Sequence, residues 1–362
     1  MIVALVYNAK PGARTSIRNG PHQVLDEEGD PVPLDALENS EEMYSEWDGA
    51  ETILAVADAL ATRHSVVLLE AGATLVERLK QAQPDLVFNM AEGLTGPGRE
   101  AQVPMVLEML GIPYTGSDPA TLALCLDKGW TKAVLAHEGV PVPNHVTVYP
   151  DAPLPDLSSL SLPVIVKPAW EGSSKGIRDN QLVHERKVLL NTVEGVLDDF
   201  NQPVLVEQFL TGREFTVAAL GNTGEWWVLP PVEIVFKDFP AGSNPIYSWE
   251  AKWVWDRPEA PLSVFQCPAK LTPVELAQLE GIVIQTLEVL RVRDWARVDV
   301  RMDQKGKPHI IEINPLPGVL PNPEDNSCFP KAARATGLSY TDLILSVVDA
   351  ALDRLGVPHE FH

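Results

Sequence analysis

Two apolar stretches around a glycine-containing turn constrain this sequence more than any other feature. Residues 297–302 (RVDVRM) and 309–314 (HIIEIN) flank the turn DQKGKP. Short strand-forming runs on either side of such a turn are typical of a β-hairpin. The sequence therefore predicts an antiparallel strand pair in its last quarter, with Lys305 and Gly306 at the turn.

One face of this hairpin is predicted to be polar. If the turn centres on Lys305 and Gly306, Asp299 lies opposite Glu312, and Arg297 lies opposite Asn314. Side chains alternate between the two faces of a strand, so these four share one face. The other face is expected to hold Val298, Val300, Ile311 and Ile313.

The two facing carboxylates point to a divalent cation. Like charges directly opposite each other destabilise a strand pair, and a cation between them removes that repulsion. Oxygen ligands of this kind suit Mg²⁺, which binds phosphate oxygens and water at its remaining positions. We therefore predict that Asp299, Glu312 and Asn314 bind metal. A solvated, charged sheet face is the alternative.

The first 115 residues alternate strands with helices, which is typical of a doubly wound parallel sheet. The predicted strands are 2–7, 65–69 and 86–89, and the predicted helices are 50–63, 75–79 and 103–110, the last ended by Gly111. Residues 10–48 are irregular and fit either a substrate-covering loop or a disordered insertion.

The rest of the chain is expected to form two further domains. Residues 116–211 read as a smaller α+β unit, with a helix at 127–139 and strands at 164–167 and 204–208. Residues 212–362 contain the hairpin and helices at 273–290 and 340–355. The predicted domains are thus 1–115, 116–211 and 212–362.

Composition narrows the class of protein. The formal net charge of −22 argues against nucleic acid and anionic membranes as partners. The 3 cysteines show no metal-ligand spacing and suit a reducing compartment. Neither a signal peptide nor an apolar run of the roughly 18 residues that span a bilayer is present. We expect a soluble, cytoplasmic protein.

The stretch VIVKPAWEGSSKG predicts a phosphate-binding loop. A buried strand delivers Lys167, and the loop from Gly172 to Gly176 then exposes backbone N–H groups. Such groups bind phosphate oxygens, and the lysine adds a positive charge. A plain flexible loop is an equally good interpretation of this segment taken alone.

The stretch VLVEQFLTGREFTV could form an adenosine site. An apolar strand ends at Glu207, and Leu210 and Glu214 follow around a glycine turn. An adenine site needs an apolar slot, and ribose hydroxyls need an acidic acceptor. An ordinary linker between two strands is the alternative, as solvated surface is for the lone lysines Lys128 and Lys252.

Together, these pieces resemble D-alanine–D-alanine ligase and its ATP-grasp relatives. The resemblance covers about residues 86–352 and rests on GIPYTGSDPATLALCLDK, LPVIVKPAWEGSSKG, VLVEQFLTGREFTV, EAKW with QCPA, and ARVDVRM with IIEINPLPG. It implies an α/β protein with the ATP-grasp fold. In that fold, two α+β subdomains enclose ATP and follow an N-terminal parallel-sheet (pre-ATP-grasp) domain.

The resemblance implies a role for each matching residue. It implies ATP and Mg²⁺ as cofactors, with two ions and Mn²⁺ as an alternative metal. Asp299, Glu312 and Asn314 match the metal ligands. Arg297 matches the arginine at the developing oxyanion, with the Gly318 backbone beside it, and Ser173 lies in the closing loop. The nucleotide contacts would be Lys128, Lys167, Ser173, Ser174, Glu207, Leu210, Glu214 and Lys252.

The sequence departs from the family pattern where substrates should bind. The N-terminal stretch YNAKPGARTS lacks the family's amine-binding glutamate, and Glu92 replaces a family histidine. Glu46 to Asp48 could replace the lost glutamate, and Cys328 is expected to be a packing thiol. The candidate substrate contacts are Glu92, Arg99, Glu100, Trp253, Asn322 and Ser327.

We therefore expect an ATP-dependent carboxylate–amine ligase that forms an amide or dipeptide-like bond through an acyl phosphate. The resemblance implies that its substrates are a small carboxylate and a small amine, both amino acids, and it is compatible with a homodimer. The alternatives are D-alanine–D-alanine ligase itself, a non-catalytic nucleotide-binding protein, and a kinase that phosphorylates a hydroxyl. The complete set of Arg297, Asp299, Glu312 and Asn314 argues for a ligase.

Overall fold

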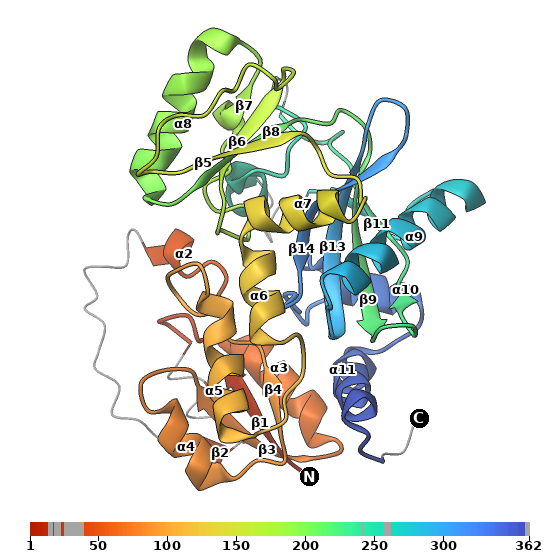
Figure 1. The fold of residues 1–362 in the computed structure, drawn as a ribbon. Coiled ribbons are helices and arrows are strands. Elements are labelled where there is room, and N and C mark those ends of the chain that lie inside the picture. Colours follow the sequence, from red (N-terminus) through yellow and green to blue (C-terminus); the bar gives the residue numbers. More distant parts are fainter. Residues whose placement is uncertain (14–16, 18–22, 25–39, 241, 256–261, 359–362) are drawn as a thin grey trace.

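The computed structural model describes residues 1–13, 17, 23–24, 40–240, 242–255 and 262–358. Within these residues the chain forms three β-sheets, each covered by helices (Figure 1). The sheets follow one another along the sequence, and one sheet falls within each of the three predicted domains.

The first sheet is parallel, as its apolar strands predicted. Its strand order is β2-β3-β1-β4, with β1 (Ile2–Tyr7), β2 (Gln23–Val24), β3 (Ser65–Glu70) and β4 (Leu86–Asn89). Helix α3 (Ala50–Ala61) covers one face, and α4 (Leu75–Ala82) and α5 (Gln102–Leu110) cover the other. Because both faces are covered, β1 is a continuous apolar run. Gly111 ends α5 with a φ of 66°, which glycine adopts without strain.

The second sheet is antiparallel and also has 4 strands. Its order is β5-β8-β6-β7, with β5 (His145–Val148), β6 (Val164–Pro168), β7 (Leu182–Val183) and β8 (Val204–Gln208). Helix α8 (Arg186–Phe200) packs its apolar residues on one face. The other face is left to the pocket between this sheet and the third one.

The third sheet carries the predicted hairpin. Its strands are β9 (Glu214–Gly221), β10 (Trp227–Val228), β11 (Val232–Ile234), β12 (Phe265–Gln266), β13 (Asp294–Met302) and β14 (Pro308–Asn314). Helix α9 (Pro273–Val289) covers one face. A capping box between Thr272 and Glu275, with Pro273 in the first turn, fixes where α9 begins.

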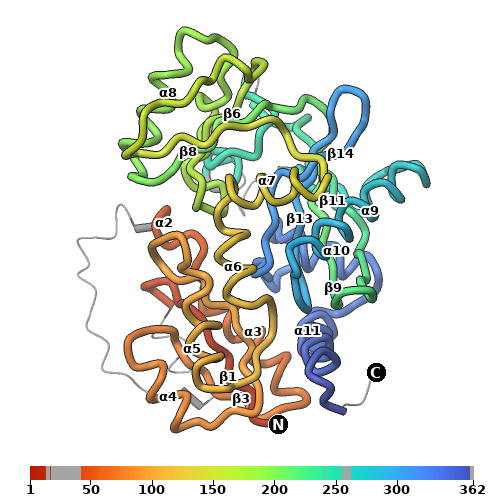
Figure 2. The backbone as a smooth tube through the Cα atoms, viewed as in Figure 1, coloured from red at the N-terminus to blue at the C-terminus, as the bar shows by residue number. Residues whose placement is uncertain are grey.

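One hydrophobic core joins the first and third sheets. Helix α11 (Tyr340–Leu355) packs against α3, and α10 (Cys328–Ala335) packs under β9. Trp295, which is fully buried, contacts Phe88 of the first sheet and Phe329 of α10. Figures 1 and 2 both show α11 beside α3, so the two ends of the chain lie in the same part of the molecule.

Helices α6 (Pro119–Leu126) and α7 (Lys128–His137) connect the first sheet to the second. Cys125 and Leu135 of these helices belong to the core of the third sheet, together with Val298 and Ile313. The two helices therefore pack with the hairpin although they precede the second sheet in the sequence. The domain limits at 115 and 211 remain predictions.

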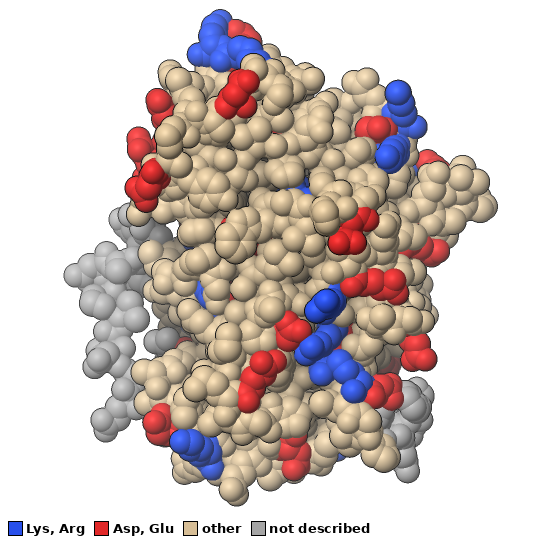
Figure 3. Space-filling view, viewed as in Figure 1, with Lys and Arg blue, Asp and Glu red and all other residues tan. Residues whose placement is uncertain are grey.

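Charged side chains are spread over the surface. Figure 3 shows acidic residues over the whole visible face, with a few groups of basic residues among them. Among the described residues, no single helix is long and apolar enough to cross a membrane, and only α10 with α11 passes that test as a pair, bent by 99°.

The ion pair between Arg354 and Asp294 links α11 to the third sheet. Arg354 Nε and Nη2 donate to the two Asp294 carboxylate oxygens at 2.9 and 2.8 Å. The Asp294 side chain is 0% exposed and also accepts from Gly116 N at 2.7 Å. A buried carboxylate without its cation is costly.

We predict that Arg354→Met lowers the free energy of unfolding by roughly 3 kcal/mol, because it leaves the Asp294 charge buried and unpaired. The matched control is Arg63→Met, which breaks a bidentate pair from Arg63, just after α3, to Asp349 of α11; these side chains are 25% and 17% exposed. That variant should lose less than about 1 kcal/mol. Denaturant unfolding measures both, and equal losses would contradict the assignment.

Candidate active site

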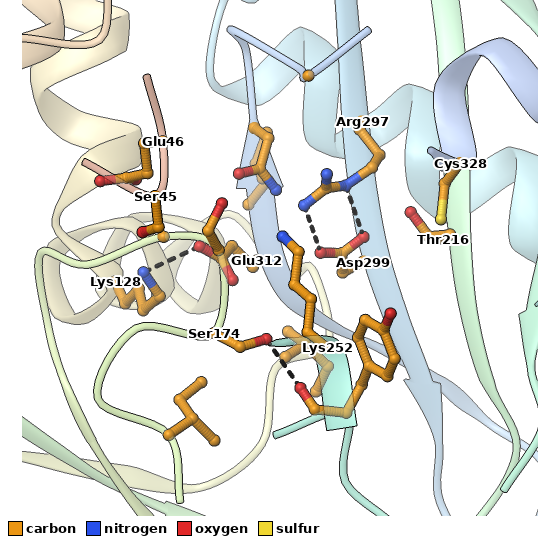
Figure 4. A pocket seen from close by; sticks show the side chains of 18 of the residues that line it. Ser45, Glu46, Lys128, Ser174, Thr216, Lys252, Arg297, Asp299, Glu312 and Cys328 are labelled. Atoms are coloured by element: carbon orange, nitrogen blue, oxygen red, sulfur yellow. Dashed lines mark hydrogen bonds and ion pairs between the residues drawn. The ribbon is translucent and has the colours of Figure 1, made fainter. Parts of the chain in front are cut away.

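A pocket with a volume of about 380 Å³ lies where the three sheets meet (Figure 4). The second and third sheets contribute polar side chains to its wall, and the first domain contributes residues that lie outside its strands, such as Glu46, Glu92 and Glu100. Of the predicted residues, the wall includes Glu92, Glu100, Lys128, Lys167, Ser173, Ser174, Glu207, Leu210, Glu214, Lys252, Arg297, Asp299, Glu312, Asn314, Gly318 and Ser327. The fold thus brings together motifs that are up to 235 residues apart, from Glu92 to Ser327 (327 − 92).

The hairpin has the predicted register. Asp299 pairs with Glu312 and Arg297 pairs with Asn314 across β13 and β14. Arg297 Nε and Nη2 each donate to Asp299 at 3.1 Å. Lys128 Nζ lies 2.9 Å from Glu312 Oε1. Each of the two facing carboxylates therefore has its own cation, which offsets their mutual repulsion.

One detail of the hairpin prediction was wrong. A β-bulge follows Asp299, so that Val300 pairs with Ile310 and Ile311 is left without a partner strand residue. Ile310 is 0% exposed in the core, whereas Ile311 lines the pocket. The extra residue of a bulge shifts the alternation of side chains between the faces, and the sequence pattern alone did not reveal it.

Three buried charges join the second sheet to the hairpin. Glu207 of β8 accepts from Lys167 of β6 at 3.2 Å and lies 2.6 Å from Lys132 of α7. Burial opposes the charge of Glu207, but the two lysines hold its pKa below its usual value. Burial in turn lowers the pKa of Lys132 to about 8.

Lys132 is a pocket-supporting residue that the sequence analysis missed. Its ammonium donates to the backbone oxygens of Ile310 at 3.1 Å and Ile311 at 2.8 Å, next to the bulge. A position four residues after Lys128 on the same helix face was the available signal. Since both oxygens of Glu207 face lysines, its carboxylate is engaged within the protein.

The glycine and serine loop has a conformation suited to its predicted role. Ser173 and Ser174 have φ values of 51° and 61°, in the left-handed region. Ser174 Oγ donates to Tyr247 O at 2.8 Å, which ties the loop to the far wall. A Cβ on Gly172 would lie 2.3 Å from Glu46 Oε1, so only glycine fits against this carboxylate.

Lys252 and Cys328 lie near the Arg297 side chain of the hairpin. Lys252 belongs to a π-helical turn, Glu250–Trp255, and Figure 4 shows it extending toward the pair of Arg297 and Asp299. Burial and the Arg297 charge lower the pKa of Lys252 to about 8. Burial raises the pKa of Cys328 to about 12, which fits a packing thiol.

The adenosine candidates lie on the wall near the second sheet. Leu210 is 9% exposed, and among the described residues its backbone N–H has no backbone acceptor. Glu214, on β9, forms an ion pair of 2.5 Å with Arg301 of β13. Arg301 also lines the pocket, and the sequence analysis did not select it.

Several of the predicted substrate contacts form an acidic cluster. Carboxylate oxygens of Glu46, Glu92 and Glu100 lie within 4.8 Å of one another. Burial, with Glu100 and Glu46, raises the pKa of Glu92 well above its usual value. Burial also raises the pKa of Glu100 to about 7. Arg99 lies behind the cluster, and its Nη2 donates to both Glu46 oxygens at 2.7 Å.

The segment before Gly49 closes this side of the pocket. Glu42, in α2 (Ser40–Met43), forms an ion pair of 2.6 Å with Arg178 beyond the serine loop. Ser45, Glu46 and Asp48 line the pocket, and burial raises the pKa of Asp48 to about 7. Within the irregular stretch 10–48, residues 40–48 thus cover the pocket. Residues 14–16, 18–22 and 25–39 of that stretch lie outside the described residues.

Asn322 and Trp253 are two further predicted substrate contacts. Asn322 is not among the residues that line the pocket; its Oδ1 accepts from Glu324 N at 3.1 Å in a turn, and its substrate contact stays a prediction. Asn326 lines the pocket instead, beside Ser327, whose Oγ accepts from Leu320 N at 3.2 Å. The Trp253 side chain lies outside the described part of the chain, and its role stays a prediction.

Comparison with known proteins agrees with this geometry. Residues 134–349 match the family model described as D-ala D-ala ligase C-terminus. The chain is 32% identical to a D-alanine–D-alanine ligase of Pelotomaculum thermopropionicum, covering 84% of this chain and 92% of the relative. It is 37% identical to an uncharacterised protein of Sinorhizobium fredii, covering 80% of this chain and 83% of the relative.

The fold agrees as well. A D-alanine–D-alanine ligase of Bacillus anthracis, solved in complex with ATP, superimposes with a TM-score of 0.64 at 20% identity and covers 98% of both chains. A second structure of that ligase gives a TM-score of 0.67. The expected ATP-grasp fold is thereby confirmed. The chain therefore belongs to the D-alanine–D-alanine ligase family and is an ADP-forming carbon–nitrogen ligase.

Proposed function

We propose that this protein uses MgATP to phosphorylate a small carboxylate and joins the acyl phosphate to an amine, at pockets that differ from those for two D-alanines. The convergence of the hairpin face with Lys128, Lys167 and Lys252 in one pocket carries this proposal. Phosphoryl transfer depends on charge neutralisation and positioning, which such a cluster supplies.

The hairpin residues fit a divalent metal. Asp299 and Glu312 offer carboxylate oxygens from directly opposite positions, and Asn314 adds an amide oxygen. Asn314 Nδ2 is buried and has no hydrogen-bond partner among the described residues, so it could donate to a phosphate oxygen while the amide oxygen faces the metal. Bound Mg²⁺, most simply two ions, would neutralise phosphate oxygens there.

Other residues would hold the nucleotide. Lys128 and Lys167 would contact phosphates, and the loop with Ser173 and Ser174 would close over them. Leu210, whose backbone N–H has no backbone acceptor among the described residues, would donate to adenine, and Glu207 would lie beside that slot. Glu214 would accept hydrogen bonds from the ribose.

Arg297 would stabilise the tetrahedral oxyanion formed when the amine attacks. The guanidinium is held by Asp299 through two hydrogen bonds of 3.1 Å, so its direction is fixed before the reaction. Such preorganisation is the main source of oxyanion stabilisation. The Gly318 backbone, which is exposed in the same wall, would lie beside it.

The acidic cluster favours a substrate amine at this end of the pocket. Arg99 pairs with Glu46, but burial and the neighbouring acids still raise the pKa of Glu92, and an ammonium group beside Glu92 and Glu100 would relieve that repulsion. Asn326 and Ser327 would contact the substrate at the other end. Cytoplasmic location and a homodimer remain predictions.

D-alanine–D-alanine ligase itself is the second candidate function, favoured by relatives of that name at 32–34% identity. The panel experiment separates the two: MgATP-dependent phosphate release is measured with D- and L-amino acids, singly and in pairs. Release with two D-alanines would support the second candidate. Release only with other carboxylates or amines would support rebuilt pockets, and a phosphorylated alcohol as product would contradict both.

We predict that Glu312→Gln abolishes phosphate release and leaves the fold intact, because it removes a charged metal ligand from a pocket-facing position. Glu288→Gln, on the exposed side of α9, is the control and should keep full activity. Activity and thermal unfolding of the purified variants measure both effects. Normal turnover by Glu312→Gln would refute the metal assignment.

We predict that Arg297→Ala still binds MgATP but forms product about 10²–10³ times more slowly, the scale of one oxyanion donor. Nucleotide binding by calorimetry and product formation by mass spectrometry separate the two steps. An unchanged rate, or loss of nucleotide binding with an intact fold, would rule out the oxyanion role.

A further inference from the structure

A second arginine of β13, Arg301, lies at the nucleotide end of the pocket. Two residues after Asp299 on the same strand, it lies directly across from Glu214 of β9. Its side chain is 7% exposed. A guanidinium buried to this extent needs several partners, because leaving its donors unpaired is costly.

Three contacts fix the direction of this guanidinium. Nη1 donates to Glu214 Oε2 at 2.5 Å, and Nη2 donates to Pro245 O at 2.9 Å. The Phe209 ring centroid lies 4.2 Å from Cζ, within the range of a cation–π contact. Phe209 adjoins Leu210, so Arg301 also connects the ribose candidate to the adenine candidate.

Glu214 is left with one free oxygen. Among the described residues, Oε1 accepts no hydrogen bond, and the side chain is 15% exposed in the pocket wall. Burial and Asp299 raise the pKa of Glu214, while Arg301 and Lys167 oppose that rise. The carboxylate thus offers one acceptor, in a direction set by its bond to Arg301.

We propose that Arg301 is a positioning residue that holds Glu214 against the ribose hydroxyls and so makes the pocket select ribonucleotides over 2′-deoxyribonucleotides. This inference rests on the proposed nucleotide site. The ligand class is a nucleoside triphosphate with a vicinal diol, since two adjacent hydroxyls can both donate to the lone pairs of the one free oxygen, Oε1. A 2′-deoxyribose would lose one of these charge-assisted bonds.

The test is the affinity of the intact protein for MgATP and for Mg-2′-deoxyATP, measured by calorimetry without any other substrate. The wild type should bind MgATP about ten-fold more tightly, the scale of one hydrogen bond to a charged group. In Arg301→Met the preference should fall to less than about two-fold, mainly through weaker ATP binding. Arg301→Lys should keep part of the preference, because it retains the charge.

The matched control is Arg213→Met. Arg213 also pairs with a glutamate, Glu233 at 2.8 Å, and lies 5.0 Å from the Phe215 ring, but it lies outside the pocket wall. This variant should keep the wild-type preference. Glu214→Gln should lose the preference as Arg301→Met does, and the double variant should lose nothing more.

The outcomes separate the inference from the proposed function. If Arg301→Met weakens the binding of MgATP and of Mg-2′-deoxyATP by the same factor, the ratio of the two affinities is unchanged. That outcome would overturn the positioning role. If Arg301→Met fails to fold, as thermal unfolding would reveal, an unchanged ratio in Glu214→Gln overturns it equally. A wild type that binds MgATP without preference also refutes this inference, whereas a wild type that binds neither nucleotide refutes the proposed function.

Discussion

The facing carboxylates of the hairpin are the constraint on which the rest of the site depends. Asp299 and Glu312 are placed opposite each other by strand register, where they repel. Two cations from different parts of the fold compensate them. Arg297 comes from the same strand, whereas Lys128 comes from the first turn of α7, so the site is complete only when α7 packs on the hairpin.

The ion pairs around Glu207 extend this dependence to the second sheet. Lys132 contacts both Glu207 and the backbone at the bulge, so one side chain fixes the second sheet and the hairpin to each other. Lys167 completes the group from β6. A buried group of this kind stabilises little by itself, but it sets the distance between the walls that would hold a nucleotide.

The pocket wall formed by the first domain differs from this one in how its charges are paired. There, the acids of the first domain are incompletely paired, and burial and mutual repulsion raise the pKa of Glu92 and Glu100. Incomplete pairing at a pocket wall is typical of a place where a ligand supplies the missing charge. The wall proposed for the nucleotide is internally compensated and the wall proposed for the substrate is not, which supports the proposal that ATP chemistry is retained while the substrates differ.

The sequence by itself determined the local elements and the motifs within them. Alternating apolar residues and a glycine turn predicted the register of Asp299 with Glu312, because hairpin pairing is set by neighbours along the chain. Only the tertiary structure decided what happens between distant segments. Lys132 pairs with Glu207 across 75 residues, and Arg301 pairs with Glu214 across 87. Glu46 pairs with Arg99 across 53 residues. The bulge that turned Ile311 into the pocket lies where Lys132 contacts the hairpin backbone, and no local pattern records that contact between distant segments.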